Sequence, residues 1–288
     1  MWIAIFVGVL IILSLTVAAT IVHSKSYYTW SPALVNDPLF SRRIDPKPPF
    51  RLTVPRGYDE GFGAADPFLV DGYIFTEIMK EGKGIIAVAE SLGESLDFIP
   101  VLEEEFHLSY PSVFRHEGIW YMIPEAYQSG SILLYRTDDF PHGWERVKPL
   151  ADIDGCDSTV FNLGGRWYMF TTSVRSKENM ILTTDNFPMG PWYTAVLSPL
   201  PREYRGGGQA LYHNGEVLLP LQPPTTILHG YGWKLEVYKV NRDLSMDKVT
   251  TIYPPTWAGG VHHLSYDPIS NQYMIDVRRY LKRQHTSK

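Results

Sequence analysis

The 288-residue chain is long enough for one large domain or two small ones, and its 44% apolar and 14% aromatic residues are ample for a sizeable core. A formal net charge of -5, without a basic stripe, argues against nucleic acid as a partner. The single cysteine, Cys156, excludes an intramolecular disulfide framework.

The chain opens on an apolar segment. Residues 2–22 carry no charge, and a stretch of this length suffices to cross a bilayer. Val17-Ala18-Ala19 resembles a signal-peptide cleavage site, but the charged start of a signal peptide is missing. We therefore expect residues 1–23 to be an uncleaved transmembrane anchor. The expected location is a single-pass protein of the Golgi, the ER or an equivalent endomembrane.

Residues 24–49 follow the expected anchor. They are rich in Pro, Ser and Tyr and show no hydrophobic periodicity. We interpret them as a stalk that holds a globular domain, residues 50–288, off the membrane.

From about residue 50 onward, one unit recurs five times. Each copy has an apolar run, a turn with Gly or Asn, and a second aromatic and apolar run, which is the pattern of a β-hairpin. The turns fall at Gly72, Gly118, Gly165, Gly215 and near Asn271, at spacings of 46, 47, 50 and 56. Such a period is typical of propeller blades.

A second pair of strand-like segments follows each hairpin, for example at Gly84–Ala89 and Ser131–Arg136. Four strands per unit and five units predict an all-β fold, a five-bladed β-propeller. A terminal strand commonly completes the blade built from the other end of the chain. We therefore expect the alternating segment Phe50–Val54 to join the fifth blade.

Hairpin geometry places the start of each first strand and the end of each second strand at one rim of the central channel. The first strands start at these residues: Asp66, Tyr110, Asp157, Gly208 and His263. The second strands end at these residues: Glu77, Glu125, Thr172 and Gln222. Arg205 lies just upstream of the fourth unit. Polar groups that converge on a concave scaffold are typical of a carbohydrate site.

These residue types suit sugar chemistry. Paired carboxylates can act as general acid and base at an anomeric carbon, and Arg205 can bind a phosphate or a carboxylate through its fork of donors. A purely structural role is the alternative for Asp66 and Asp157, because the side chain of an Asp before a strand often hydrogen-bonds to its own backbone. The pair His262–His263 is more often structural than metal-binding, since no other His or Cys has ligand spacing.

Several segments between about residues 60 and 280 match a known domain, most specifically the run from Ser109-Tyr110-Pro111 to Ile123-Pro124-Glu125. The other matching segments are Ala65–Leu69, Asp157–Thr159, Arg205–Gly207, Gln222, Tyr231–Gly232 and Gly260–His263. On these residues the chain resembles the five-bladed propeller domain at the N-terminal end of plant glucosamine inositol-phosphoceramide transferases, often labelled exostosin-like. It is distantly similar to glycoside hydrolase family 43 type propellers.

The resemblance to the hydrolases is incomplete. The Asp base at the start of their first blade is matched by Asp66, but the second-blade Asp that tunes the acid is replaced by Tyr110. Their third-blade Glu acid has only Asp157 as a counterpart. In the plant transferases a separate nucleotide-sugar domain follows the propeller. We therefore expect either that this propeller binds donor and acceptor itself, or that it binds an acceptor for another glycosyltransferase chain.

The resemblance implies a membrane-anchored glycosyltransferase that acts on a glycan or glycolipid at the propeller mouth, with a nucleotide-sugar donor such as UDP-xylose. The alternatives are a family 43-like glycosidase and a noncatalytic carbohydrate-binding module of a glycan-synthesis complex. A divalent cation, Mn²⁺ or Mg²⁺, on the diphosphate of the donor stays open as a cofactor.

The implied roles divide the candidate residues. Asp66 or Asp157 would be the general base on the acceptor hydroxyl, and Glu125 completes the catalytic candidates. Arg205 and His263 would stabilise the leaving diphosphate. The remaining residues would bind and orient the sugars: Glu77, Tyr110, Gln222, Tyr231 and His262.

Overall fold

The computed structural model describes residues 28–39, 50–91 and 95–280. Within these residues the regular elements are β-strands and one 3-10 turn, η1 (Tyr127–Ser129). In the same ranges, no helix has the length and apolar character that a bilayer crossing requires. The expected anchor over residues 1–23 lies outside the described residues.

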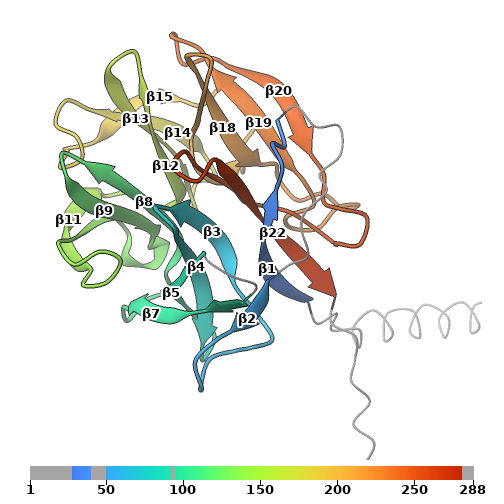
Figure 1. Cartoon of the computed structure of the whole chain (residues 1–288). Coiled ribbons are helices and arrows are strands. Elements are labelled where there is room, and N and C mark those ends of the chain that lie inside the picture. The colour runs from blue at the N-terminus through green and yellow to red at the C-terminus, as the bar shows by residue number, and fades with distance from the viewer. Residues whose placement is uncertain (1–27, 40–49, 92–94, 281–288) are drawn as a thin grey trace, which may run out of the picture.

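Five antiparallel sheets follow one another along the chain and surround a central axis (Figure 1). The first blade consists of β3 (Ala65–Val70), β4 (Tyr73–Lys80), β5 (Lys83–Glu90) and β7 (Ile99–Leu102). The second consists of β8 (Ser109–His116), β9 (Ile119–Glu125), β10 (Ile132–Thr137) and β11 (Glu145–Ala151). The third consists of β12 (Gly155–Leu163), β13 (Arg166–Ser173), β14 (Asn179–Thr184) and β15 (Tyr193–Leu197). The fourth consists of β16 (Arg205–Gly206), β17 (Leu211–His213), β18 (Glu216–Gln222), β19 (Leu235–Val240) and β20 (Met246–Ile252).

The fifth blade contains both ends of the described chain. β21 (Leu264–Asp267) pairs with β22 (Gln272–Tyr280), and β22 pairs with β1 (Tyr28–Val35) over eight residues. The prediction of an all-β, five-bladed propeller is thus confirmed, and β1 closes the ring.

The closing strand is not the one that the sequence predicts. Residues 28–35, expected in the stalk, form β1, whereas the expected strand at Phe50–Val54 contributes β2 (Arg51–Thr53). β2 pairs in parallel with the short β6 (Ser95–Asp97) beside the first blade. Pro32 argues against a strand in a sequence pattern, but β1 is an edge strand and tolerates a residue without an N–H donor.

The apolar side chains form one cluster between each pair of neighbouring blades rather than a single central core. Phe75 and Met122, for example, belong to a cluster shared by the first and second blades. Leu69 and Met274 belong to the cluster where the first blade meets the fifth. The ring therefore buries the apolar faces of all five sheets, as expected of a closed propeller.

Trp30 tests the closing strand. Its side chain is 3% exposed, whereas Tyr28, two residues earlier on β1, is 44% exposed. We expect Trp30→Ala to lower the free energy of unfolding by roughly 3–5 kcal/mol, because it removes a large buried ring. Tyr28→Ala should change it by less than about 1 kcal/mol. Chemical denaturation measures both, and equal effects would contradict the placement of β1 in the fifth blade.

Candidate functional site

The first strands of three blades share a distortion. Register shifts interrupt β3, β8 and β12 near their starts, where Asp66, Tyr110 and Asp157 have φ values of 52°, 46° and 49°. Residues other than glycine seldom adopt this conformation, which costs energy and persists where the surroundings impose it. A bulge re-aims a side chain. In the first three blades it directs one side chain toward groups that other blades contribute.

Arg205 on β16 links three blades at this end of the axis. Its Nε donates to Oδ2 of Asp157 at 2.6 Å, and its Nη2 donates to Oε2 of Glu125 at 2.9 Å. Both carboxylates are buried, while the Arg205 side chain is 34% exposed. Nε2 of Gln222 lies 3.4 Å from the same Asp157 oxygen and donates to the carbonyl of Gly206 at 2.7 Å. The guanidinium thus joins two buried carboxylates and keeps one side toward solvent.

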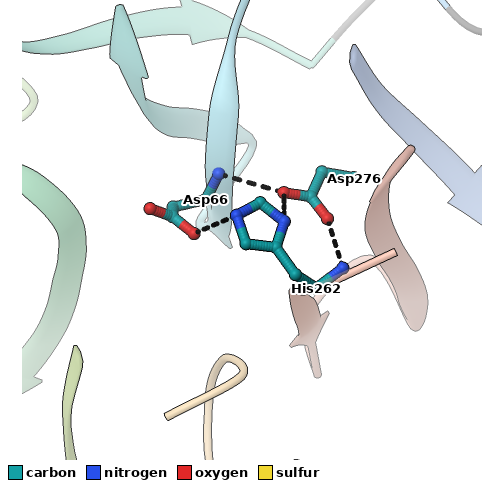
Figure 2. A group of neighbouring side chains, drawn as sticks. All are labelled: Asp66, His262 and Asp276. Atoms are coloured by element: carbon teal, nitrogen blue, oxygen red, sulfur yellow. Dashed lines mark hydrogen bonds and ion pairs between the residues drawn. The ribbon is translucent and has the colours of Figure 1, made fainter. Parts of the chain in front are cut away.

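A second charged group lies at the junction of the first and fifth blades (Figure 2). Nε2 of His262 lies 3.3 Å from Oδ1 of Asp66, and Nδ1 lies 2.6 Å from Oδ2 of Asp276. Asp276 also accepts from the backbone N–H groups of His262 and His263 at 3.0 Å each, and from that of Asp66 at 3.3 Å. The ring of Trp30 covers His262, with 4.0 Å between ring centroids. Asp276 is therefore the residue that fixes His262 beside Asp66.

The surroundings set opposite charges on Asp66 and His262. Burial alone would raise the pKa of Asp66, but His262 and His263 outweigh it and lower the pKa to about 2. Burial likewise disfavours the charged form of His262, but Asp276 and Asp66 outweigh it and raise the pKa above its ordinary 6.5. The two groups form a buried ion pair.

Two other carboxyls are shifted in the opposite direction. Burial, reinforced by the carboxylates of Asp66 and Glu125, raises the pKa of Glu77 well above its usual range. Burial and the neighbouring Glu125 raise the pKa of Asp157, although Arg205 opposes the shift. One end of the axis thus holds one carboxyl with a lowered pKa, Asp66, and two with raised pKa values, Glu77 and Asp157. That pattern is typical of acid and base pairs.

A pocket of about 310 Å³ opens beside Arg205. Its lining includes the ends of second strands from three blades, at Glu125, Thr172 and Gln222. Tyr231 stands against the guanidinium of Arg205, with 5.7 Å from Cζ to the ring centroid, and Lys177 adds a second cation. The pocket therefore presents charged, amide and aromatic groups together, as sugar sites do.

Two predicted rim residues lie deeper than expected. Tyr110 is fully buried, and its hydroxyl accepts from the backbone N–H of Gly208 at 2.7 Å and donates to the Gly208 carbonyl at 2.8 Å. His263 is also fully buried and packs against the rings of Phe68 and Tyr110. Nδ1 of His263 lies 3.5 Å from Oδ1 of Asp66. The roles predicted for Tyr110 and His263 at the sugar and the diphosphate stay predictions.

The other predicted residues gather at the expected end of the axis. The Arg205 group contains Asp157, Glu125 and Gln222, and Tyr231 borders it. The Asp66 group contains His262, and Glu77 lies 3.3 Å from Nε2 of His107. The substrate and catalytic roles of these residues stay predictions.

Sequence reasoning missed Asp276. It lies within β22, the second strand of the fifth hairpin, at the same end of the axis as Glu77, Glu125, Thr172 and Gln222 on the second strands of the other blades. A count of five residues from the turn at Asn271, which is the separation of Gly72 and Glu77 in the first unit, would have found it. The sequence pattern did not indicate Lys177 as a site residue, because Lys177 lies in a loop whose position the strand pattern does not determine.

Two groups of side chains bring potential metal ligands within 4.8 Å of one another. In the first, Asp66, His262 and Asp276, both ring nitrogens of the histidine already face carboxylate oxygens. In the second, Arg205 occupies Glu125 and Asp157, and burial raises the pKa of the Cys156 thiol. Cysteine binds a metal ion as the thiolate, and histidine binds it as the neutral imidazole. Among the described residues, these two sets therefore do not fit Mn²⁺ or Mg²⁺, which prefer free oxygen ligands.

Fold and site together define the class: a five-bladed β-propeller with a charged axial mouth. A family model described as glucosamine inositolphosphorylceramide transferase 1, N-terminal, matches residues 54–255. The chain belongs to this family.

Curated relatives support the assignment. Glucosamine inositolphosphorylceramide transferase 1 of Oryza sativa subsp. japonica is 32% identical over 205 residues, which cover 65% of this chain and 27% of the relative. The protein of the same name from Arabidopsis thaliana is 37% identical over 105 residues, covering 33% of this chain and 14% of the relative. The chain thus spans about a quarter or less of the length of these relatives.

Solved structures share the fold. A thermostable family-43 glycoside hydrolase has a TM-score of 0.57 at 13% identity, and the match covers 76% of this chain and 90% of that one. The catalytic domain of the Coprinopsis cinerea GH62 α-L-arabinofuranosidase has a TM-score of 0.56 at 14% identity, covering 88% and 98%. At such identities the likeness shows the propeller fold alone.

The raised pKa of His262 predicts a pH-dependent loss of stability. The ion pairs of His262 stabilise the fold fully below the ordinary pKa of 6.5, and this contribution is lost as the pH rises through the higher pKa of the folded state. His262→Gln should therefore cost roughly 3–5 kcal/mol at pH 5, because two buried carboxylates lose their partner, and less at pH 9.

Denaturant titrations of wild type and His262→Gln across this pH range measure the difference. His142→Gln serves as the control, because His142 lies exposed in the loop between β10 and β11. A cost for His262→Gln that stays constant from pH 5 to pH 9 would contradict the ion pairing.

Proposed function

We propose that the chain is a membrane-anchored glycosyltransferase that acts on a glycan or glycolipid, with the propeller mouth as its sugar site. The observation that carries the proposal is the fork of Arg205 between Glu125 and Asp157 at the edge of a pocket of about 310 Å³. Membership in a family named for a transferase supports the reaction class. The proposed location is an endomembrane such as the Golgi or the ER, with residues 1–23 as the anchor.

In this proposal Asp66 is the general base. Its low pKa keeps it ionised at neutral pH, and Asp276 fixes the orientation of its partner His262. Glu125, Arg205 and Gln222 bind sugar hydroxyls through carboxylate, guanidinium and amide groups. Fixed groups of this kind lower the barrier by holding the acceptor in one orientation.

A nucleotide-sugar donor requires positive charge for its diphosphate. Arg205 and Lys177 border the same pocket and are the cations that would meet it. Asp157 and Glu125 hold Nε and Nη2 of Arg205, and the side of the guanidinium that faces solvent keeps donors for an anion. A pentosyl donor such as UDP-xylose stays the specific proposal.

A glycosidase is the second candidate. The observation that favours it is the separation of the carboxyl pKa values, low for Asp66 and raised for Asp157 and Glu77, because a hydrolase needs one ionised and one protonated carboxyl. The Arg205 contact argues against it, since the guanidinium occupies the oxygen of Asp157 from which an acid would donate.

A panel of nucleotide sugars and aryl glycosides tests the proposal. The protein is incubated with each compound, and free nucleoside diphosphate and free aglycone are measured. Diphosphate release that a glycan or glycolipid acceptor accelerates is the expected result. Aglycone release instead would establish the glycosidase. Release of neither nucleoside diphosphate nor aglycone would contradict catalysis by this chain alone. The chain would then be a binding module that works with another glycosyltransferase.

Substitution of the carboxylates tests their roles. We expect Asp66→Asn to lower kcat by about 10²–10⁴-fold, the usual contribution of a general base. Glu117→Gln is the matched control, because Glu117 is exposed at the β8–β9 turn on the opposite face. If Asp157→Asn loses this rate and Asp66→Asn keeps it, Asp157 is the base. Wild-type rates for both variants would contradict the assignment.

A further inference from the structure

Exposed apolar side chains gather on the mouth side of the fourth and fifth blades. Ile227 and Leu228, at the tip of the loop between β18 and β19, have relative exposures of 105% and 86%. The other exposed members are aromatic: Tyr28, Tyr253, Trp257 and Tyr280. These six residues are called the apolar face below. A large exposed apolar surface marks contact with a partner or a membrane.

Strand direction places these residues on the mouth side. β18 ends at Gln222 in the site, and the next strand begins at Leu235, which pairs with Ile252 at the end of β20. The segments 223–234 and 253–263 therefore both lie at the mouth end of the fourth blade. β22 passes the site at Asp276 and ends four residues later at Tyr280, which pairs with Tyr28.

Arg278 joins these segments into one surface. Its Nη1 donates to the carbonyl of Tyr231 at 2.7 Å, and its Nη2 donates to that of Gly259 at 2.6 Å. Its guanidinium also lies over the ring of Tyr28, 5.5 Å from the centroid. The apolar face is thus tied to the loop that carries Tyr231, which borders the pocket.

The path of the chain indicates what contacts the apolar face. β1 begins at Tyr28 on the apolar face, and the uncharged apolar segment 2–22 ends only six residues earlier. Six residues span at most about 22 Å when fully extended. If residues 2–22 cross a bilayer, its surface therefore lies within that distance of the apolar face.

The residue types agree with this occupant. Tyr and Trp side chains favour the boundary between headgroups and hydrocarbon, where an apolar ring and a polar tip are both accommodated. Ile227 and Leu228 are suited to insert below that boundary. Arg279, exposed beside Tyr280, carries a charge that anionic headgroups attract.

We propose that the apolar face rests on the surface of the bilayer that anchors the chain, so that the propeller mouth is held beside the lipid headgroups. The docking does not rest on the proposed function.

A fluorescent probe tests the docking. The full chain with Cys156→Ser receives a single cysteine through Leu228→Cys, is labelled with a nitrobenzoxadiazole probe, and is reconstituted into lipid nanodiscs. We expect lipids with a spin label near the headgroup to quench this probe severalfold more than a probe introduced through Ile269→Cys. Ile269 is the matched control, because it is 75% exposed at the β21–β22 turn on the opposite face.

Each other outcome overturns the proposal. Equal quenching at the two positions, or none at Leu228→Cys, would place the apolar face away from lipid. Emission that changes with protein concentration rather than with spin-labelled lipid would assign the face to a second copy of the chain. Recovery of the protein without lipid would remove the anchor on which the argument depends. No substrate is used, so a negative transferase assay does not affect the result.

Discussion

The structure depends on the neutralisation of buried negative charge at one end of the propeller axis. The following carboxyls are buried there: Asp66, Glu77, Glu125, Asp157 and Asp276. Two cations, Arg205 and His262, contact four of them. An unpaired buried charge costs several kcal/mol, so these contacts are required for the blades to meet around the axis. Because each cation bridges carboxyls from different blades, the same contacts that hold the ring together also build the site.

Backbone strain contributes to the same arrangement. Asp66, Tyr110 and Asp157 hold positive φ angles at equivalent bulges of three blades. Two of these side chains are carboxyls that face the cations, while Tyr110 hydrogen-bonds across the axis to Gly208. Gly206 permits this close approach, since a Cβ there would lie 2.7 Å from the Tyr110 hydroxyl. The same bulge geometry therefore serves two purposes: it builds the charged site, and it closes the interior of the propeller.

The site differs from a plain acid and base pair in its central arginine. A guanidinium between Glu125 and Asp157 offers several donors to sugar hydroxyls and retains a cation for a phosphate group. This combination agrees with a family named for a transferase and with a fold shared by glycoside hydrolases. An apolar face beside the mouth would bring this site to substrates embedded in a membrane.

Much of the fold was readable in the sequence because a propeller repeats one local pattern. Hairpin turns at Gly72, Gly118, Gly165 and Gly215 recur at a nearly constant period, and alternation within each hairpin defines which residues reach the rim. The sequence by itself therefore determined the blade number and placed most of the candidate residues at one end of the axis. These are local properties of single hairpins, and they do not depend on how the hairpins meet.

Tertiary structure decided what depends on contacts between distant segments. β1 closes the fifth blade because its buried face pairs with β22, almost the whole chain away, and an edge position accepts Pro32. Tyr110 and His263 are fully buried because blades from opposite parts of the chain bring their rings together. Asp276 gains its importance only when His262 and Asp66 meet it. Closing a ring and pairing buried charges are long-range events, and no local pattern encodes them.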